Sequence, residues 1–309
     1  MIATLNSADL RLLQVFKAVV ECGGFSAAQI ELNVSQSTIS TQMAYLETRL
    51  GARLCQRGRA GFNLTEDGRL VYEASQRLFR SLDAFAAEVG EMRGRLVGDL
   101  HLATIDNVIS NRDCPLHEAV TLFKRRAGAV RLTLHVGPPL EIERAVLDGR
   151  YHVGIGTFPS HAPGLAYRAL FRERMSLYCG RDHPLFGRDD ADLTLTEIGA
   201  AEYARRGYAT ASRIAALTPR NVSATAFNME AIAVMVLSGR FIGHLPDHYA
   251  ARWVGQGSMR ALKPERLSFD SPFEIVVRKG PPRTAAADIF LEVMTDVCRT
   301  AGGVAAAEA

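Results

Sequence analysis

The stretch of residues 25–50, FSAAQIELNVSQSTISTQMAYLETRL, limits the possible folds of this chain more than any other. It predicts two helices that are separated by a tight turn at Asn33. Ser26 is a suitable N-cap for the first helix and Ser35 for the second, and Gly51 ends the second. Apolar residues of the second helix recur at spacings of four, three and four, and so form one stripe that must be buried: Ile39, Met43, Leu46 and Leu50.

The opposite face of the second helix is polar and uncharged. Its side chains are short or planar and can donate and accept hydrogen bonds, which is the chemistry needed to recognise base edges in a DNA major groove. With the helix start, this reading face consists of Ser35, Gln36, Ser37, Thr38, Ser40, Thr41, Gln42 and Tyr45. A solvated face in a small helical bundle has the same pattern, so this segment alone leaves both interpretations open.

Arginines follow the second helix. Two short strand-like pieces, residues 53–57 and 62–65, flank a turn with glycines at 58 and 61, which predicts a hairpin. Because an amphipathic helix precedes residue 22, the whole predicts a winged helix-turn-helix. The reading face lacks a cation, and phosphate contacts supply most of the salt-dependent affinity for DNA. We therefore expect Arg53, Arg57 and Arg59 to help bind DNA.

Residues 66–97 predict one long linker helix with a seven-residue apolar repeat. Such a stripe on a charged helix needs a partner, and the same helix of a second subunit is the simplest one. The expected dimerisation residues are Val71, Leu78, Leu82, Phe85, Val89 and Met92. A two-fold dimer would present two reading helices to an inverted-repeat operator. Packing of the stripe against the C-terminal part of the same chain is the alternative.

Beyond residue 97, strand-like and helical stretches alternate, which favours a parallel α/β sheet. Strands are expected at 99–105, 131–137 and 152–157, and the chain crosses between two lobes near 160–170 and 265–272. A small ligand would bind in the cleft between these lobes. The predicted domains are residues 1–65 for DNA binding, 66–97 for the linker and 98–309 for effector binding, with lobe 1 at about 98–165 and 272–300 and lobe 2 at about 166–271.

Composition sets the broad class of protein. The 309 residues are 48% hydrophobic and 22% charged, as in an ordinary globular protein, and the net charge is only +3. Five cysteines without CxxC spacing indicate neither a disulfide framework nor a thiolate zinc site. The first residues do not have the pattern of a signal peptide, and no apolar run is long enough to span a bilayer. We expect a cytoplasmic protein without a metal, a cofactor or a membrane partner.

An enzyme is the main rival interpretation. Gly154 and Gly156 follow a strand, but Pro159 stands where a dinucleotide fingerprint needs its third glycine. The sequence contains no GxxxxGK[ST] loop and no GxSxG elbow. His244 and His248 lie on either side of Pro246 and are poorly placed to share a metal. A small-molecule binding protein of the transport type would leave the first 97 residues without a role, so a non-enzymatic regulator is preferred.

The chain resembles the LysR-type transcriptional regulators. The resemblance covers essentially the whole sequence and is strongest from Phe16 to Gly68. It is carried by Ser35-Gln36-Ser37, Leu46-Glu47, Leu64-Thr65-x-x-Gly68 and the later phrase GRFIGHLP at 239–246. It implies an α+β multidomain bacterial regulator with a winged helix-turn-helix, a linker helix and a two-lobed α/β domain like periplasmic binding proteins. It also implies a homodimer or homotetramer that binds double-stranded DNA and a small-molecule effector, with RNA polymerase as a further partner.

The same resemblance implies which residues would line the effector site: Thr104, Asp106, Asn107, Thr157, Phe158, Tyr203, Asn228 and His244. Thr104 and Asn228 offer hydrogen bonds, and helix N-termini nearby could hold a carboxylate. Asp106 favours an amine, whereas Arg205 and Arg206 favour a carboxylate, so both classes of effector stay open. Thr41 stands where the family often has arginine. We therefore expect this position to influence which operator sequence the chain prefers.

Overall fold

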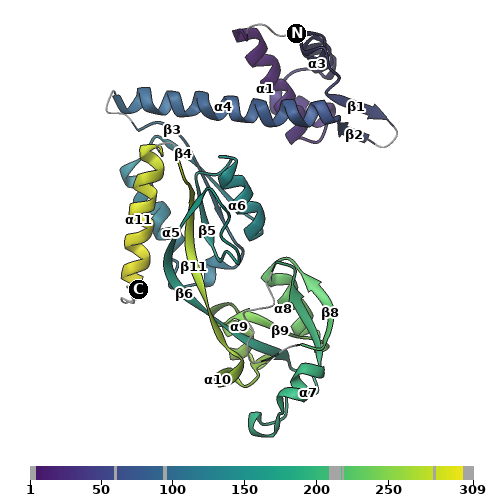
Figure 1. Ribbon diagram of the computed structural model, residues 1–309, viewed down its shortest axis with the longest axis vertical. Helices are drawn as coiled ribbons and strands as arrows, with labels where there is room; N and C mark the ends of the chain where they lie inside the picture. Colours follow the sequence, from purple (N-terminus) through teal and green to yellow (C-terminus); the bar gives the residue numbers. More distant parts are fainter. Residues whose placement is uncertain are drawn as a thin grey trace. The chain divides into compact units, whose positions relative to one another are not determined.

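The computed structural model describes residues 5–58, 61–92, 96–208, 217, 219–280 and 283–301. The chain divides into two compact units, Met1–Phe85 and Ala86–Ala309 (Figure 1). The first unit contains three helices and a hairpin, followed by most of a long helix. Their bounds are α1 (Ser7–Glu21), α2 (Phe25–Leu32), α3 (Gln36–Leu50), β1 (Cys55–Gly58), β2 (Gly61–Leu64) and α4 (Glu66–Met92). The predicted winged helix-turn-helix is thereby confirmed.

The core of the first unit forms where the apolar stripes of its helices meet. Ile39, Met43 and Leu46 of α3 are buried, and Leu50 packs against the same core at its edge. Helix α1 contributes most of the remaining core residues, and Phe16, fully buried, lies edge-to-face against a tyrosine of α4. The apolar spacing seen in the sequence therefore sets how α3 is oriented, with the polar side outward.

Local capping fixes the ends of α2 and α3. The Ser35 side chain accepts a hydrogen bond from Thr38 N at 3.2 Å, and Gly51 ends α3 with φ 68°. Asn33 has φ 52° and forms the turn between the helices. The prediction of Ser26 as an N-cap is wrong, because α2 already begins at Phe25, after Gly24. Phe25 is buried and packs edge-to-face against Phe62 of the wing, which brings the helix start forward.

Thr65 joins the wing to α4. Its Oγ1 accepts a hydrogen bond from Gly68 N at 2.9 Å and donates one to Arg53 O at 2.6 Å. Its backbone N–H donates to Leu54 O at 3.0 Å. An ideal β-carbon on Gly68 would lie 2.0 Å from that same Leu54 oxygen. Helix α4 therefore begins in direct backbone contact with the chain that leads into the wing.

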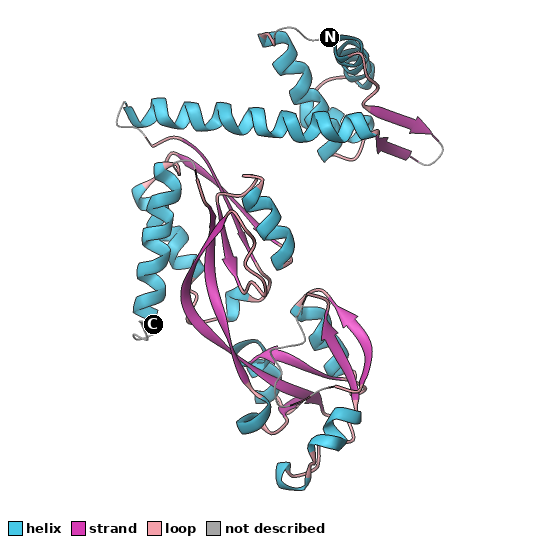
Figure 2. Cartoon of the chain, viewed as in Figure 1, coloured by secondary structure: helices cyan, strands magenta, loops and turns pink. Residues whose placement is uncertain are grey.

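The second unit is built on one mixed sheet (Figure 2). Its main strands run in the order β4 (Val130–Val136), β3 (Gly98–Thr104), β5 (Val153–Gly156), β11 (Phe269–Arg278), β6 (Leu165–Gly180), β9 (Ile242–Pro246), β7 (Glu202–Arg206) and β8 (Asn221–Ala226), while β10 (Met259–Ala261) pairs with β6. The helices are η1 (Val108–Ser110), α5 (Leu116–Arg126), α6 (Pro139–Leu147), η2 (Asp190–Asp192), α7 (Leu195–Ala200), α8 (Met229–Leu237), α9 (Asp247–Gly255), α10 (Pro264–Leu267) and α11 (Ala285–Ala301).

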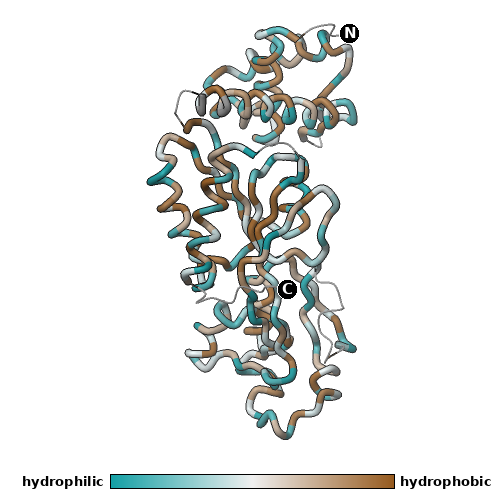
Figure 3. Tube along the Cα trace, turned by 60° about the vertical axis from the view of Figure 1, so that its left-hand side comes forward, coloured by the Kyte–Doolittle hydropathy of each residue, from teal (hydrophilic) through white to brown (hydrophobic). Residues whose placement is uncertain are grey.

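Two long strands connect the lobes. Strands β6 and β11 pair antiparallel from Phe269 opposite Met175 to Arg278 opposite Leu165. The expectation of a parallel sheet holds for β3, β4 and β5 and for β7 with its neighbours β8 and β9, but not for these crossing strands. Separate hydrophobic cores lie on each side of the crossing. Hydrophobic and hydrophilic residues alternate in short runs along the described trace (Figure 3).

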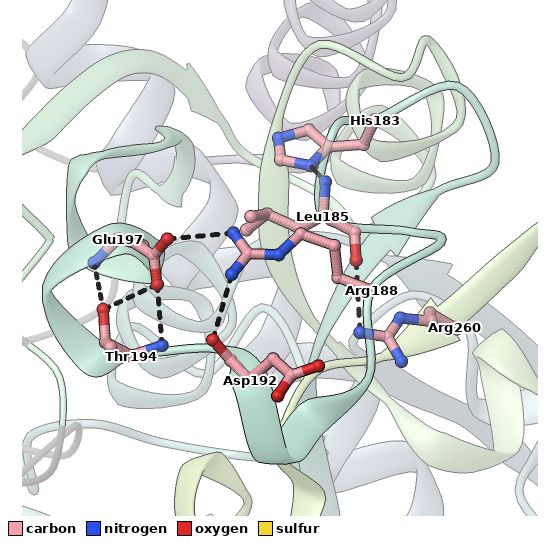
Figure 4. A network of polar contacts seen from close by, with 7 residues as sticks. All are labelled: His183, Leu185, Arg188, Asp192, Thr194, Glu197 and Arg260. Carbon is pink, nitrogen blue, oxygen red and sulfur yellow. Dashed lines mark hydrogen bonds and ion pairs between the residues drawn. The ribbon is translucent and has the colours of Figure 1, made fainter.

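A polar network fixes the loop that follows β6 in lobe 2 (Figure 4). Arg188 donates to Glu197 Oε1 and to Asp192 O, both at 2.9 Å, and Thr194 and Glu197 form a capping box on α7. Arg260 donates to Leu185 O at 3.1 Å. The hydrogen bonds from Thr194, with that from Arg188, lower the pKa of Glu197 to about 2. This network holds the loop by charge and capping, in addition to Leu185 and Leu193, which are buried in the neighbouring core.

Candidate DNA-binding face and inter-lobe site

The predicted reading face lies on the outer side of α3 and at its N-terminus. Six of its eight residues are exposed and two are half-buried, while the apolar stripe of the same helix is in the core. The exposed ones are Ser35, Gln36, Ser37, Thr38, Thr41 and Tyr45, and the half-buried ones are Ser40 and Gln42. The fold thus presents uncharged hydrogen-bonding groups on one accessible helix surface, which is the form required to enter a major groove.

Hydrogen bonds within the chain order the start of this face. Ser35 Oγ lies 2.8 Å from both Ser37 Oγ and Thr38 Oγ1, and Gln36 N donates to Gln29 Oε1 at 3.1 Å. The hydroxyl of Thr41 donates to Ser37 O at 3.0 Å, so its oxygen faces outward chiefly as an acceptor. These contacts hold the first turn of α3 in one arrangement before any DNA is bound.

Gln42 differs from most of the reading face because it is half-buried. Its Oε1 is buried and has no hydrogen-bond partner among the described residues. A buried amide oxygen without a partner is costly, so a donor from a bound molecule would be stabilising there.

Of the three wing arginines, only Arg53 is fully described by the structure. Arg53 is exposed ahead of β1, and Arg57 lies on β1 opposite Phe62. The side chain of Arg57 and the whole of Arg59 lie outside the described residues. Arg49 at the end of α3 is committed elsewhere, because it pairs at 2.6 Å with Asp9 of α1, whose side chain is 1% exposed. Burial tends to raise the pKa of Asp9, but its hydrogen bonds with Asn6 and Arg49 hold it below its ordinary value.

The predicted dimerisation stripe divides into two parts along α4. Val71 and Leu78 pack against the core of the first unit. Leu82 and Phe85 are exposed, by 41% and 65%, and Val89 is half-buried. The side chain of Met92 is not among those described. The first half of the stripe thus attaches α4 to its own reading head, while Leu82 and Phe85 leave an apolar surface at the middle of the helix.

The candidate effector site lies where the parallel strands of lobe 1 end. Strands β3 and β5 are neighbours, with Thr104 opposite Ile155, and Ile105 N extends the ladder by donating to Ile155 O at 3.2 Å. Gly156 allows this close approach, since a β-carbon there would lie 2.6 Å from Ile105 Cγ2. Thr104 and Thr157 are buried, and the Oγ1 of each lacks a hydrogen-bond partner in the described structure, as does Asn107 Oδ1.

Asp106 and Asn228 meet at the start of α8. The Asp106 carboxylate, from lobe 1, accepts a short hydrogen bond from Met229 N in lobe 2. Asn228 caps the same helix by accepting from Ala231 N at 2.8 Å. Burial raises the pKa of Asp106, although the Met229 hydrogen bond and the Arg206 guanidinium oppose that effect. Asp106 is therefore a direct polar link between the lobes.

A second inter-lobe link was absent from the sequence prediction. Glu173 on β6, only 5% exposed, accepts from Asn111 Nδ2 at 3.2 Å and bonds His248 Nε2 at 2.9 Å. The other ring nitrogen of His248 lies 3.0 Å from Ser110 Oγ in lobe 1. Three segments up to 138 residues apart in sequence meet here. No local motif marks them, although a lone glutamate inside a strand is an unusual residue to bury.

The remaining predicted effector residues belong to the cores of the lobes. Phe158 is fully buried in lobe 1 and lies edge-to-face against Tyr167. In lobe 2, His244 Nδ1 lies 2.9 Å from Tyr203 Oη, and its Nε2 lies 3.2 Å from Leu267 O. Burial lowers the pKa of His244 to about 4, so its ring is neutral at pH 7. These three side chains are therefore core residues, whereas Thr104, Asp106, Asn107 and Thr157 lie at or just after the strand ends.

Among the residues that the structure describes, no three histidine, cysteine or acidic side chains form a group that could hold a metal ion. Within the same ranges, each helix is too short or too polar to cross a membrane. The five cysteines are free thiols.

Comparisons with known proteins agree with this two-part architecture. Residues 10–69 match the family of bacterial regulatory helix-turn-helix proteins of the lysR type, and residues 93–299 match the LysR substrate binding domain. The HTH-type transcriptional activator BauR of Pseudomonas aeruginosa is 43% identical over 287 residues, covering 93% of this chain and 94% of that protein. The probable regulator LrrA of Synechococcus elongatus is 30% identical, covering 88% of this chain and 86% of its own length.

A solved structure shows the same fold. Full-length CbnR in complex with its target DNA is 23% identical, with a TM-score of 0.65 over 94% of this chain and 99% of that one.

Proposed function

The chain belongs to the LysR family of transcriptional regulators, and we propose that α3 recognises its operator through the exposed face from Ser35 to Tyr45. It is a DNA-binding regulator with an effector-binding C-terminal domain. One observation supports the assignment of the face more than any other. From Ser35 to Tyr45, the stretch that buries Ile39 and Met43 carries no charged side chain, and its exposed side chains other than Ala44 can form hydrogen bonds. Such groups discriminate base edges, whereas charged groups chiefly hold phosphates.

Affinity for the DNA backbone then comes from the wing. Arg53 is exposed and Arg57 lies on β1, and we propose that these two and Arg59 pair with phosphates. Each phosphate contact releases counterions and so adds to the salt dependence of binding.

We assign the dimer contact to the exposed middle of α4. Leu82 and Phe85 would pack against the same residues of a second copy, because apolar side chains at this spacing otherwise stay in water. A two-fold dimer presents two α3 helices to the two halves of an inverted repeat. Assembly into a tetramer, action in the cytoplasm and contact with RNA polymerase complete the proposal. The relative BauR is an activator by name, and we propose activation for this chain as well.

The inter-lobe site would receive the effector. Because Asp106 and the Glu173–His248 pair both bridge the lobes, a ligand bound there changes the free energy of one arrangement of the lobes relative to another. Its effect on DNA binding would then be a coupling free energy between two sites.

Two measurements test the assignment of α3 and the wing to DNA binding. The first is selection from a random duplex library, and the second is the affinity for the selected DNA over a range of salt concentrations. The wild type should select an inverted repeat. Gln36→Ala should relax its sequence preference, whereas Gln14→Ala, the same change on the exposed side of α1, should not. Arg57→Ala should weaken binding to all sequences and reduce the salt slope by about one, with Arg77→Ala on exposed α4 as its control. If Gln36→Ala left both affinity and preference unchanged, α3 would not be the reading helix.

A further inference from the structure

Three buried oxygens at the inter-lobe site have no hydrogen-bond partner in the described part of the chain. They are Thr104 Oγ1, Asn107 Oδ1 and Thr157 Oγ1. Thr104 is 3% exposed and Thr157 is 8% exposed, so bulk water does not satisfy them. Buried polar atoms in native proteins are nearly always paired, and each exception needs an explanation. All three oxygens can accept hydrogen bonds. The amide oxygen can only accept, whereas each threonine hydroxyl can also donate.

The sheet register brings these oxygens to the same place as Asp106. Thr104 is opposite Ile155 on the parallel strands β3 and β5, and Ile105 continues the ladder. Asp106 follows β3 in a turn, and Thr157 is the first residue after β5. Asn107 is the next residue and has φ 59°, which turns the chain at this point. One carboxylate and three unpartnered oxygens therefore lie at the end of two neighbouring strands.

Two backbone donors at the start of α8 are already occupied. The N-terminus of α8 is the natural place for an anion, but Asp106 accepts from Met229 N and Asn228 accepts from Ala231 N. An anionic effector at that helix end would face the charge of Asp106 at close range. Glu173 adds a second acidic group, and Arg206 is the cation that acts on Asp106. An anionic ligand would therefore meet two carboxylates here, with Arg206 as the opposing cation.

We propose that the effector is a small primary amine, whose ammonium pairs with Asp106 and donates hydrogen bonds to oxygens of Thr104, Asn107 and Thr157. An ammonium carries three N–H donors and no acceptor, which complements a group of acceptor oxygens beside a carboxylate. The inference rests on the proposed effector site and adds the chemical class of the ligand. Burial also raises the pKa of Asp106, although the Met229 hydrogen bond and the Arg206 charge oppose that effect.

Three compounds of equal chain length separate the charge classes: n-butylamine, 4-aminobutyrate and butyrate. Binding to the full-length protein is measured by calorimetry, and the melting temperature is followed against ligand concentration, since a ligand that binds only the folded state raises Tm. Both amines should bind and raise Tm, and butyrate should do neither. Amines of two to six carbons, with and without a terminal carboxylate, then define the preferred length.

Two variants locate the ammonium. Asp106→Asn keeps an oxygen for Met229 N and removes the charge, so the Kd for the best amine should rise about 10- to 100-fold. Thr157→Val keeps the side-chain shape and removes one acceptor, and should raise the Kd roughly 3- to 10-fold. Thr121→Val is the matched control, because its exposed hydroxyl bonds only to its own helix at His117 O, and it should leave the Kd unchanged.

Binding of butyrate alone, or tighter amine binding by Asp106→Asn, would overturn the proposal, and so would the failure of every amine in the series to bind. Binding of the unliganded full-length protein to its selected inverted repeat is measured in parallel. That binding depends on the first unit, so its loss would refute the proposed function, while its retention with no amine binding would refute only the effector class.

Discussion

Gly68 should not accept even one added methyl group, although it lies in a helix where alanine is ordinarily the better residue. A β-carbon at this position would lie 2.0 Å from Leu54 O and 2.9 Å from Leu54 C. Both are backbone atoms, so no side-chain rotation can relieve the contact. Gly68→Ala is therefore expected to force α4 away from the segment that leads into the wing.

The size of the effect follows from opposing contributions. Carbon and oxygen atoms must separate by about 1 Å or more, and overpacking of that kind costs about 1–3 kcal/mol. The displacement also weakens the hydrogen bond from Thr65 N to Leu54 O, which contributes about 1 kcal/mol. In the opposite direction, replacing glycine by alanine inside a helix stabilises the folded state by about 1 kcal/mol. The net loss is about 2 kcal/mol, or roughly 8–16 °C in the Tm of a unit of this size.

Gly255→Ala provides the matched control. Gly255 ends helix α9, and a β-carbon there meets nothing within 4 Å. The control should leave Tm unchanged or raise it slightly. Scanning calorimetry of the full chain, combined with hydrogen exchange on peptides around residues 53–72, assigns the change to the first unit. If Gly68→Ala melted at the wild-type temperature with unchanged exchange, the backbone contact between α4 and Leu54 would be wrong.

Three further predictions concern a cap, a titration and the assembly. Ser35→Ala should cost about 1 kcal/mol in chemical unfolding of the first unit, because it removes the side-chain N-cap of α3; an unchanged midpoint would contradict the cap. Glu197, whose pKa is about 2 against an ordinary 4.5, contributes stability that is present above pH 4.5 and is lost as pH falls toward 2. Its carboxyl NMR signal should titrate near pH 2, and Arg188→Ala should raise that midpoint. Phe85→Asp should dissociate the dimer in sedimentation, whereas a monomeric wild type would refute the α4 contact.

The first unit could be predicted from sequence because its determinants are local. The stripe of Ile39, Met43 and Leu46, the cap at Ser35 and the stop at Gly51 each depend on residues within one or two helical turns. Ser26 misled the prediction for the opposite reason. The start of α2 is set by Phe25 packing on Phe62, a contact between residues 37 positions apart in sequence, and this burial overrides the local capping preference.

The second unit was harder to predict because its decisive contacts are distant in sequence. Strand β6 begins at Leu165, but charged side chains such as Arg168, Arg172 and Glu173 interrupt its apolar pattern and conceal its first half. They are tolerated because β6 pairs with β11 through backbone hydrogen bonds, which carry no sequence signature. The bond between Glu173 and His248 joins residues 75 positions apart and could not be inferred from either residue alone.

Asp106 connects the chemistry of the effector with the arrangement of the lobes. Its carboxylate, in lobe 1, accepts from Met229 N, the first residue of α8 in lobe 2. An ammonium paired with the same carboxylate would remain within reach of both lobes, so binding and the inter-lobe contact depend on one charge. Asp106→Asn keeps the acceptor for α8 but weakens the pair with an amine. The variant should therefore retain operator binding and lose the response to amines, because a ligand shifts an equilibrium only through its differential affinity for the two states.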